Sequence, residues 1–271
     1  MARALIGIVV GVALAYVGFG ALLFTFQRDQ QYHPGGSIAV PASSAERGVS
    51  LVTLAVPDGE RIAAWYRAAE PGHPTILYLP GNGGSVADSH DRFEELIDAG
   101  FGLLGISYRG YPGSTGSPTQ DGLFLDAEAG YDFLAENGVS PGDVIVYGWS
   151  LGSGVATHLA SRRAVGALVL EAPFLSAESI ARMRYPMYPI RLLMKDPFRS
   201  DLLLSDLTVP LVVVHGTEDE TIPFAHGREI VERYQGPKQL IEIPGGSHTD
   251  IWDRDGWEKV RAALVELGAL D

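Results

Sequence analysis

The chain has 271 residues and a formal net charge of −13 at pH 7. Such an acidic chain is not expected to bind nucleic acid, because proteins recognise that polyanion mainly through Lys and Arg. The sequence has no cysteine, which excludes a thiol nucleophile and a disulfide framework, and it has no Cys/His/carboxylate set at metal-ligand spacing, so neither a metal nor another cofactor is expected.

The first apolar segment, residues 4–26, contains no charged residue. In a helix this run extends about 35 Å, enough to cross the roughly 30 Å hydrocarbon core of a bilayer. We predict a single-pass transmembrane anchor over residues 1–28 that contributes no chemistry. Arg3 precedes the span, while Arg28 and Asp29 cancel after it, so the N-terminus is expected in the cytoplasm and the rest of the chain on the extracytoplasmic side. A cleaved signal peptide is the alternative.

After the anchor, residues 29–50 are rich in proline, glycine and serine and are expected to form a tether to a domain over residues 51–271. Two strand-like runs, 51–56 and 62–67, flank a Pro-Asp-Gly turn and predict an antiparallel pair. From residue 75 onward, apolar strand-like runs alternate with helical periodicity. This alternation predicts a mostly parallel sheet with helices on both faces.

A strand-like run over 143–147 leads into Gly148-Trp149-Ser150-Leu151-Gly152, and helical periodicity follows. A serine at such a sharp strand-to-helix turn is exposed above the sheet edge, and the flanking glycines avoid collisions of a Cβ with neighbouring backbone. The N-terminus of the helix directs free N–H groups and a positive dipole end at the same place. Ser150 is therefore the predicted nucleophile.

Two later strands end in residues that complete a serine, acid and histidine series in chain order. Asp219 follows one apolar strand-like run, and His248 follows the next in a Gly-Gly-Ser loop. Because the carboxyl ends of parallel strands meet at one edge of a sheet, we expect Asp219 and His248 to lie beside Ser150. Glu171, after the preceding strand, is the alternative acid. His215 is only four residues from Asp219 and is not expected to act as the base.

Residues 174–206 separate two predicted strands and are expected to form a short helical lid. Its central part is basic, with five Lys or Arg residues against two acidic residues over 177–200. Met183, Met187 and Met194 also lie there, and their adaptable apolar side chains are expected to bind the acyl part of a substrate. The basic residues suit an anionic headgroup or a membrane surface. A packed helix pair with solvated cations is the alternative.

Together these motifs resemble the α/β-hydrolase superfamily, and residues 50–270 are most similar to its serine-aminopeptidase-like and membrane-anchored acyl-hydrolase branch. The resemblance implies the α/β-hydrolase fold with an eight-stranded, mostly parallel sheet. A strand runs into Pro80-Gly81-Asn82-Gly83-Gly84, where relatives carry a similar His-Gly-Asn turn. The resemblance implies that the backbone N–H groups of Asn82 and Leu151 bind the oxyanion. Pro80 stands where the family usually has His, which leaves that backbone donor in place.

The predicted chemistry is hydrolysis of a small-molecule acyl substrate through an acyl-enzyme on Ser150. A carboxylic ester or thioester is the first expectation. A serine peptidase or aminopeptidase acting on short peptides is the second, and a catalytically silent binding protein is the third, since one fold hosts many functions. The sequence leaves the oligomeric state open.

Overall fold

The computed structural model describes residues 1–270, and Asp271, the last residue of the predicted domain, lies outside the described residues. The strands of the main sheet are β2 (Ser50–Ala55), β3 (Arg61–Arg67), β4 (Thr75–Leu79), β6 (Gly102–Ile106), β7 (Val144–Trp149), β8 (Ala167–Glu171), β9 (Leu211–Gly216) and β10 (Lys238–Ile243). Their order is β10-β9-β8-β7-β4-β6-β3-β2 in one eight-stranded sheet. Strand β3 is antiparallel to both β2 and β6, and the other pairs are parallel. The expected mostly parallel, eight-stranded sheet is confirmed.

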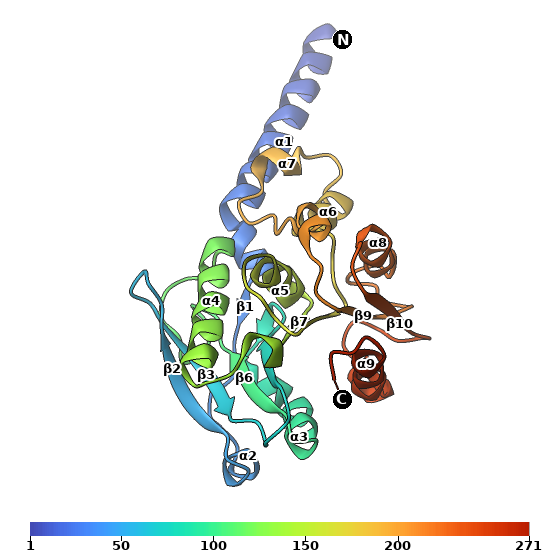
Figure 1. Ribbon diagram of the computed structural model, residues 1–271. Helices are drawn as coiled ribbons and strands as arrows, with labels where there is room; N and C mark the ends of the chain where they lie inside the picture. Colours follow the sequence, from blue (N-terminus) through green and yellow to red (C-terminus); the bar gives the residue numbers. More distant parts are fainter. Residues whose placement is uncertain (271) are drawn as a thin grey trace.

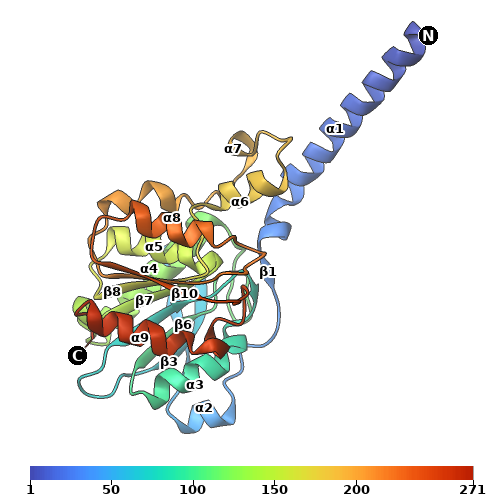
Figure 2. The same cartoon turned by 90° about the vertical axis from the view of Figure 1, so that its right-hand side faces the viewer.

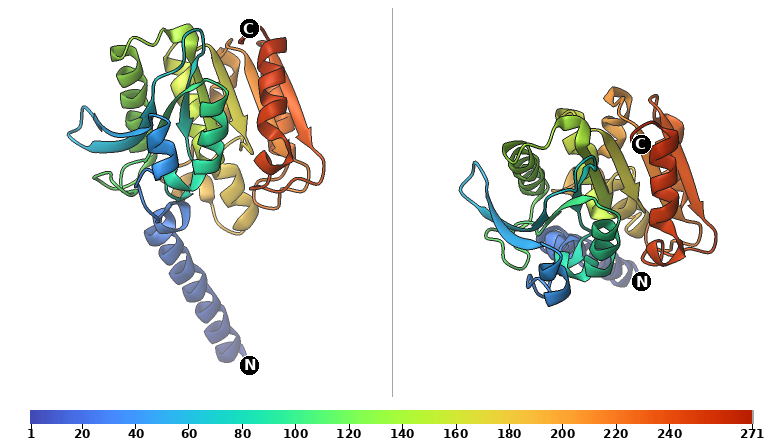
Figure 3. Two further views of the ribbon diagram at one scale, coloured as in Figure 1. Left: turned by 90° about the horizontal axis from the view of Figure 1, so that it is seen from below. Right: turned by 60° about the horizontal axis from the view of Figure 1, so that its bottom comes forward.

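Helices cover both faces of this sheet (Figures 2 and 3). One face carries α4 (Gln120–Glu136), α5 (Leu151–Arg162) and α8 (Ala225–Arg233), and the other carries α3 (His90–Asp98) and α9 (Gly256–Glu266). Successive residues of a strand point to opposite faces, so in β4 Leu77 and Leu79 join the first core, whereas Ile76 and Tyr78 join the second. The short 3₁₀ helices are η1 (Val86–Ser89), η2 (Pro141–Asp143), η3 (Ser200–Leu202), η4 (Leu204–Asp206) and η5 (Trp252–Arg254).

The N-terminal helix α1 (Ala2–Gln31) projects from the domain as one long rod (Figure 1). Its most apolar part has a mean hydropathy of 2.4 and is not buried, so its length and composition suffice to cross a membrane. The backbone of Phe26 departs from helical angles, with φ −101° and ψ 15°, and this places a kink where the apolar run ends. The helix continues to Gln31, past the expected limit of the anchor at residue 28.

The segment after α1, expected to form a tether over residues 29–50, packs on the domain. Strand β1 (His33–Pro34) pairs in parallel with β5 (Gly83–Gly84). Further along, the indole N–H of Trp65 donates a hydrogen bond of 2.9 Å to the carbonyl of Ile38. Apolar residues scattered among the prolines and glycines supply the packing that composition alone concealed. The short helix α2 (Ala42–Glu46) lies in the same segment.

Between β8 and β9 the chain forms the helical lid, beside the domain end of α1 (Figures 1 and 2). The lid contains α6 (Ala177–Arg184) and α7 (Ile190–Leu193). The ring of Tyr188, between these two helices, stacks on the ring of Tyr16 in α1, with centroids 4.6 Å apart. The lid therefore contacts the N-terminal helix as well as the domain.

The turn from β7 into α5 packs backbone against backbone. A Cβ at Gly148 would lie 2.4 Å from the carbonyl oxygen of Gly152, and a Cβ at Gly152 would lie 1.9 Å from the carbonyl oxygen of Leu79. No side chain fits at either position unless the backbone moves. The predicted role of the two glycines agrees with this geometry, which holds Ser150 at the carboxyl end of β7.

We predict that Gly152→Ala destabilises the protein, because its methyl group meets the backbone of β4. Overpacking of this kind costs about 3 kcal/mol, and the melting temperature of the detergent-solubilised protein should fall by roughly 5–10 °C. Gly142→Ala is the matched control, since a Cβ there has no atom within 4 Å. Equal melting temperatures for the two variants would contradict the packing described for this turn.

Candidate active site

Ser150 occupies a strained backbone conformation between β7 and α5. Its φ of 51° and ψ of −114° lie in a region that non-glycine residues rarely adopt. Two hydrogen bonds hold this turn: the N–H of Ser150 donates to the carbonyl of Glu171 at 2.9 Å, and the hydroxyl of Ser153 donates to the carbonyl of Ser150 at 2.6 Å. These contacts maintain the strained turn, which holds the serine hydroxyl above the sheet edge.

The structure brings together the three residues that the sequence places at the ends of β7, β9 and β10. The Nε2 atom of His248 lies 2.9 Å from Oγ of Ser150, and its Nδ1 atom lies 2.7 Å from Oδ2 of Asp219. A carboxylate accepts hydrogen bonds only, so Nδ1–H donates to Asp219 and Nε2 is left to accept from the serine hydroxyl. This arrangement can remove a proton from Ser150.

Asp219 is held as a buried anion. Its Oδ1 atom accepts hydrogen bonds of 2.8 Å from the N–H groups of Thr221 and Ile222. Its Oδ2 atom faces Nε2 of His215 at 3.2 Å as well as His248. Burial alone raises the pKa of this carboxyl, but the bonds from His215, His248 and the Ile222 N–H outweigh it and hold the pKa well below its usual range. Asp219 therefore stays charged and orients His248.

His215 has a role that the sequence interpretation missed. That interpretation rejected it as the base, and it makes no hydrogen bond to Ser150 among the described residues. Its Nε2–H instead points at Asp219 Oδ2 and at the carbonyl of Ile222, 2.9 Å away. The spacing of four residues between His215 and Asp219, at a strand end, is the signal for this contact.

Glu171, the alternative acid, lies in a separate network. Its Oε2 atom accepts hydrogen bonds from Arg92 at 2.7 Å and from the hydroxyl of Tyr147 at 2.6 Å. The guanidinium of Arg92 also lies over the ring of Trp149, 4.8 Å from the centroid. Within residues 1–270, Glu171 makes no hydrogen bond to His248, so it supports the turn beside Ser150 rather than the histidine.

Asn82 and Leu151 line the same cavity as Ser150. In the part of the chain that the structure describes, the backbone N–H of neither residue donates to another protein group. The carbonyl of Asn82 accepts from the N–H of His33 at 2.8 Å and from the hydroxyl of Tyr111 at 2.7 Å, which fixes the turn. Both N–H groups are therefore available to an oxyanion.

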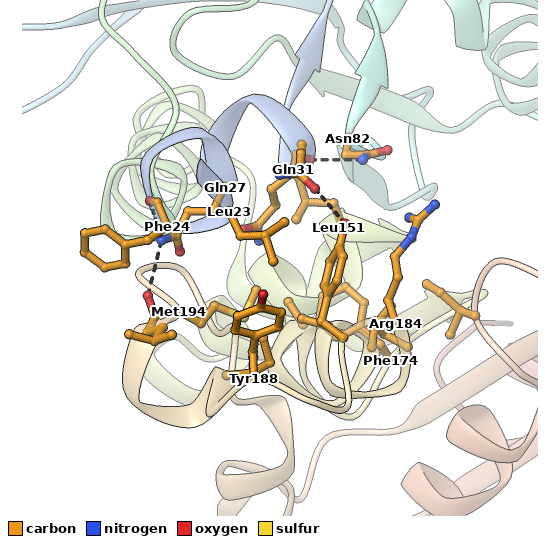
Figure 4. A pocket seen from close by; sticks show the side chains of 18 of the residues that line it. Leu23, Phe24, Gln27, Gln31, Asn82, Leu151, Phe174, Arg184, Tyr188 and Met194 are labelled. Carbon is orange, nitrogen blue, oxygen red and sulfur yellow. Dashed lines mark hydrogen bonds between the residues drawn. The ribbon is translucent and has the colours of Figure 1, made fainter. Parts of the chain in front are cut away.

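The cavity has a volume of about 260 Å³ and is lined by α1, the lid and the turn at Ser150 (Figure 4). Of the three methionines expected to bind substrate, Met194 lines it, whereas Met183 and Met187 do not and are 58% and 75% exposed. The expectation for Met183 and Met187 is therefore wrong. The lining positions of α6 are 177, 180, 181 and 184, which form one helical face, and position 183 falls outside that face.

The N-terminal helix also contributes to this cavity, contrary to its expected role as an anchor alone. Its lining residues follow helical spacing and are Gly20, Leu23, Phe24, Gln27, Gln30 and Gln31. Hydropathy identifies a span but says nothing of which face meets the domain.

No group of three or more His, Cys, Asp or Glu side chains within residues 1–270 is arranged to hold a metal ion.

Comparisons with known proteins agree with this architecture. A family model described as the alpha/beta hydrolase fold matches residues 74–201. The chain is 31% identical over 265 residues to an uncharacterised protein of Mycobacterium tuberculosis, and the alignment covers 95% of this chain and 94% of that protein. It is 31% identical over 198 residues to alpha/beta hydrolase domain-containing protein 17B of Homo sapiens, covering 71% of this chain and 67% of the relative.

Solved structures share the fold. The Pyrococcus furiosus esterase Pf2001 superposes with a TM-score of 0.69 at 17% sequence identity, covering 88% of this chain and 98% of that one. An identity this low establishes the fold alone. The two relatives at 31% identity, by contrast, align with this chain in sequence along most of their length. The chain therefore belongs to the α/β-hydrolase family.

Proposed function

We propose that this protein is a membrane-anchored serine hydrolase that cleaves carboxylic esters or thioesters. The observation that carries the proposal is the hydrogen-bonded series Ser150–His248–Asp219, which opens into an apolar cavity. The parts of a nucleophilic acyl transfer are all present there: an activated hydroxyl, a general base, an orienting anion and free N–H donors.

In the first half of the reaction, Oγ of Ser150 attacks the acyl carbonyl carbon while Nε2 of His248 accepts the hydroxyl proton. The carbonyl oxygen becomes an oxyanion, which the N–H groups of Asn82 and Leu151 stabilise. Asp219, kept ionised by its hydrogen bonds, stabilises the imidazolium. The tetrahedral intermediate then expels the alcohol or thiol, and His248 returns the proton to that leaving group.

In the second half, His248 takes a proton from a water molecule, whose oxygen attacks the acyl-enzyme carbonyl. The same two N–H groups stabilise the second oxyanion, and the Ser150–acyl bond breaks. His248 returns the proton to Oγ of Ser150, so that the free carboxylic acid leaves and the serine is regenerated. Both halves use side chains already in hydrogen-bond contact.

The lining of the cavity favours an acyl substrate over a peptide N-terminus. Its walls are mainly apolar side chains, and no acidic side chain lines it among the described residues. An aminopeptidase needs a negative partner for the α-ammonium group of its substrate, because a buried cation without one is costly. The aminopeptidase alternative from the sequence therefore has less support than ester or thioester hydrolysis.

The length and hydropathy of α1 support the anchor. The charges at its ends support an orientation with the N-terminus in the cytoplasm and the catalytic domain on the extracytoplasmic side, since Arg3 precedes the span and Arg28 is followed by Asp29.

Ser150→Ala should abolish hydrolysis of an activated ester and labelling by a fluorophosphonate probe, because it removes the attacking oxygen. The loss should reach several orders of magnitude in kcat. Ser161→Ala, at the far end of α5, is the control and should behave as the unsubstituted protein. Near-normal turnover by Ser150→Ala would refute the assignment of the nucleophile.

The two candidate acids are separated by a second pair of variants. Asp219→Asn should lower kcat by about a thousandfold or more, since a neutral amide favours the wrong tautomer of His248. Glu171→Gln should change kcat little and should instead lower the free energy of unfolding by about 3–5 kcal/mol, because it leaves the buried charge of Arg92 without its partner. Steady-state kinetics and thermal unfolding of both variants measure this, and the opposite ranking in kcat would move the acid to Glu171.

Met194→Ser should lower kcat/KM for long-chain esters relative to acetyl esters by about four- to fifteenfold, which corresponds to lost contact with one or two methylene groups. Met187→Ser is the control, because its side chain does not line the cavity. If both variants kept the unsubstituted chain-length profile, the lid wall would not contact the acyl chain.

A further inference from the structure

The helix α1 presents one face to the cavity that contains Ser150. Gly20, Leu23, Phe24 and Gln27 line the cavity at the spacing of a single helical face. Figure 4 shows Leu23, Phe24 and Gln27 on the side of the cavity opposite the lid. The cavity is therefore composite: without α1 it has no wall there.

Polar contacts hold α1 against the lid at several levels. The amide of Gln27 uses both of its ends, donating to the carbonyl of Leu193 at 3.2 Å and accepting from the N–H of Lys195 at 2.7 Å. Nearer the domain, Arg28 pairs with Asp196 at 2.7 Å. A helix that served only as an anchor would need none of these contacts. They keep the wall formed by α1 in register with the lid.

The contact between α1 and the lid that lies farthest from the domain is well inside the apolar run. The hydroxyl of Tyr16 donates to the carbonyl of Met187 at 2.7 Å, and the hydroxyl of Tyr188 donates to the carbonyl of Tyr16 at 3.0 Å. Tyr16 is about 15 Å along the helix from Phe26, or half of a hydrocarbon core of about 30 Å. A membrane that contains the apolar run of α1 therefore also contains the tip of the lid.

The exposed apolar residues of the lid agree with that depth. Met187 is 75% exposed and Leu192 is 83% exposed, and both belong to the part of the chain beside α1. Large apolar side chains exposed in this way cost little in lipid but are unfavourable in water. Arg182, Arg184 and Arg191 are also exposed on the lid. The lid surface thus suits the boundary between the acyl chains and the headgroups of one leaflet, where apolar side chains enter the lipid and long basic side chains reach the headgroups.

We infer that α1 is a substrate-binding element: the acyl chain of the substrate lies between α1 and the lid, and it enters from the lipid leaflet in which both are immersed. This inference rests on the proposed function and names its substrate class, an acyl ester or thioester that resides in the membrane. The chain-length preference of Ser150 is then set in part by residues of the transmembrane helix.

Two neighbouring glycines of α1 provide a matched test. A Cβ at Gly20 would lie 2.8 Å from Cε1 of Tyr188, so a larger side chain there enters the space between α1 and the lid. A Cβ at Gly18 has no atom within 4 Å. Gly20→Leu and Gly18→Leu add the same apolar volume to the span, but only the first narrows the cavity. Leu23→Ala and Leu22→Ala form a second pair, since Leu23 lines the cavity and Leu22 does not.

The experiment uses the full chain in phospholipid nanodiscs and measures the rate at which ethyl and hexadecyl fluorophosphonates label Ser150. Gly20→Leu should lower the ratio of the hexadecyl rate to the ethyl rate by about tenfold or more, and Leu23→Ala should lower it by about five- to twentyfold, because each variant removes contact with one or two methylene groups of the long chain. Gly18→Leu and Leu22→Ala should keep the ratio of the unsubstituted protein. The readout does not require the natural substrate.

An unchanged ratio in both Gly20→Leu and Leu23→Ala would overturn the inference while leaving the proposed function intact. So would an equal change in each variant and its matched control, because the effect would then come from the span as a whole. Failure of both reagents to label the unsubstituted protein would instead overturn the proposed function, since the serine would not be reactive.

Discussion

The close packing of the turn at Ser150 is the constraint on which the rest of the site depends. Gly152 brings α5 against the backbone of β4, and Gly148 lets the start of the helix lie directly on β7. Between these glycines, Ser150 is held at a positive φ, which raises its hydroxyl above the sheet edge. Because α5 packs so closely on β4, Leu151 at the start of α5 and Asn82 in the turn after β4 line the same cavity. The proposed nucleophile and the proposed oxyanion donors therefore share one structural cause.

Two buried carboxylates lie at neighbouring strand ends, and their partners separate their roles. Asp219 is surrounded by N–H donors and two imidazoles, which stabilise its anion and leave it directed at His248. Glu171 accepts hydrogen bonds from the guanidinium of Arg92 and the hydroxyl of Tyr147, so its carboxylate is directed at those two residues and not at His248. Charge alone does not distinguish an orienting acid from a structural one; the identity of the donors does.

The sequence was sufficient to predict what depends on strand order and strand ends. The parallel sheet, the turn at Ser150 and the convergence of Asp219 and His248 all follow from apolar runs and the polar residues just after them. Contacts between distant segments were not predictable in the same way. The cavity face of α6 excludes Met183, and only the fold reveals that face. The place of α1 beside the lid depends on pairs such as Tyr16 and Tyr188, which no local pattern connects.

The cavity connects these features, because both Ser150 and the helix α1 line it. In the proposed reaction, Ser150 carries the acyl group during turnover. The direct test uses a long-chain p-nitrophenyl ester that is hydrolysed slowly. The reaction is quenched rapidly with acid, and peptide mapping by mass spectrometry then locates the acyl group. We predict an acyl adduct on Ser150 that forms at the rate of the p-nitrophenol burst and decays at the rate of turnover. Turnover without that adduct, or with the acyl group on another residue, would contradict it.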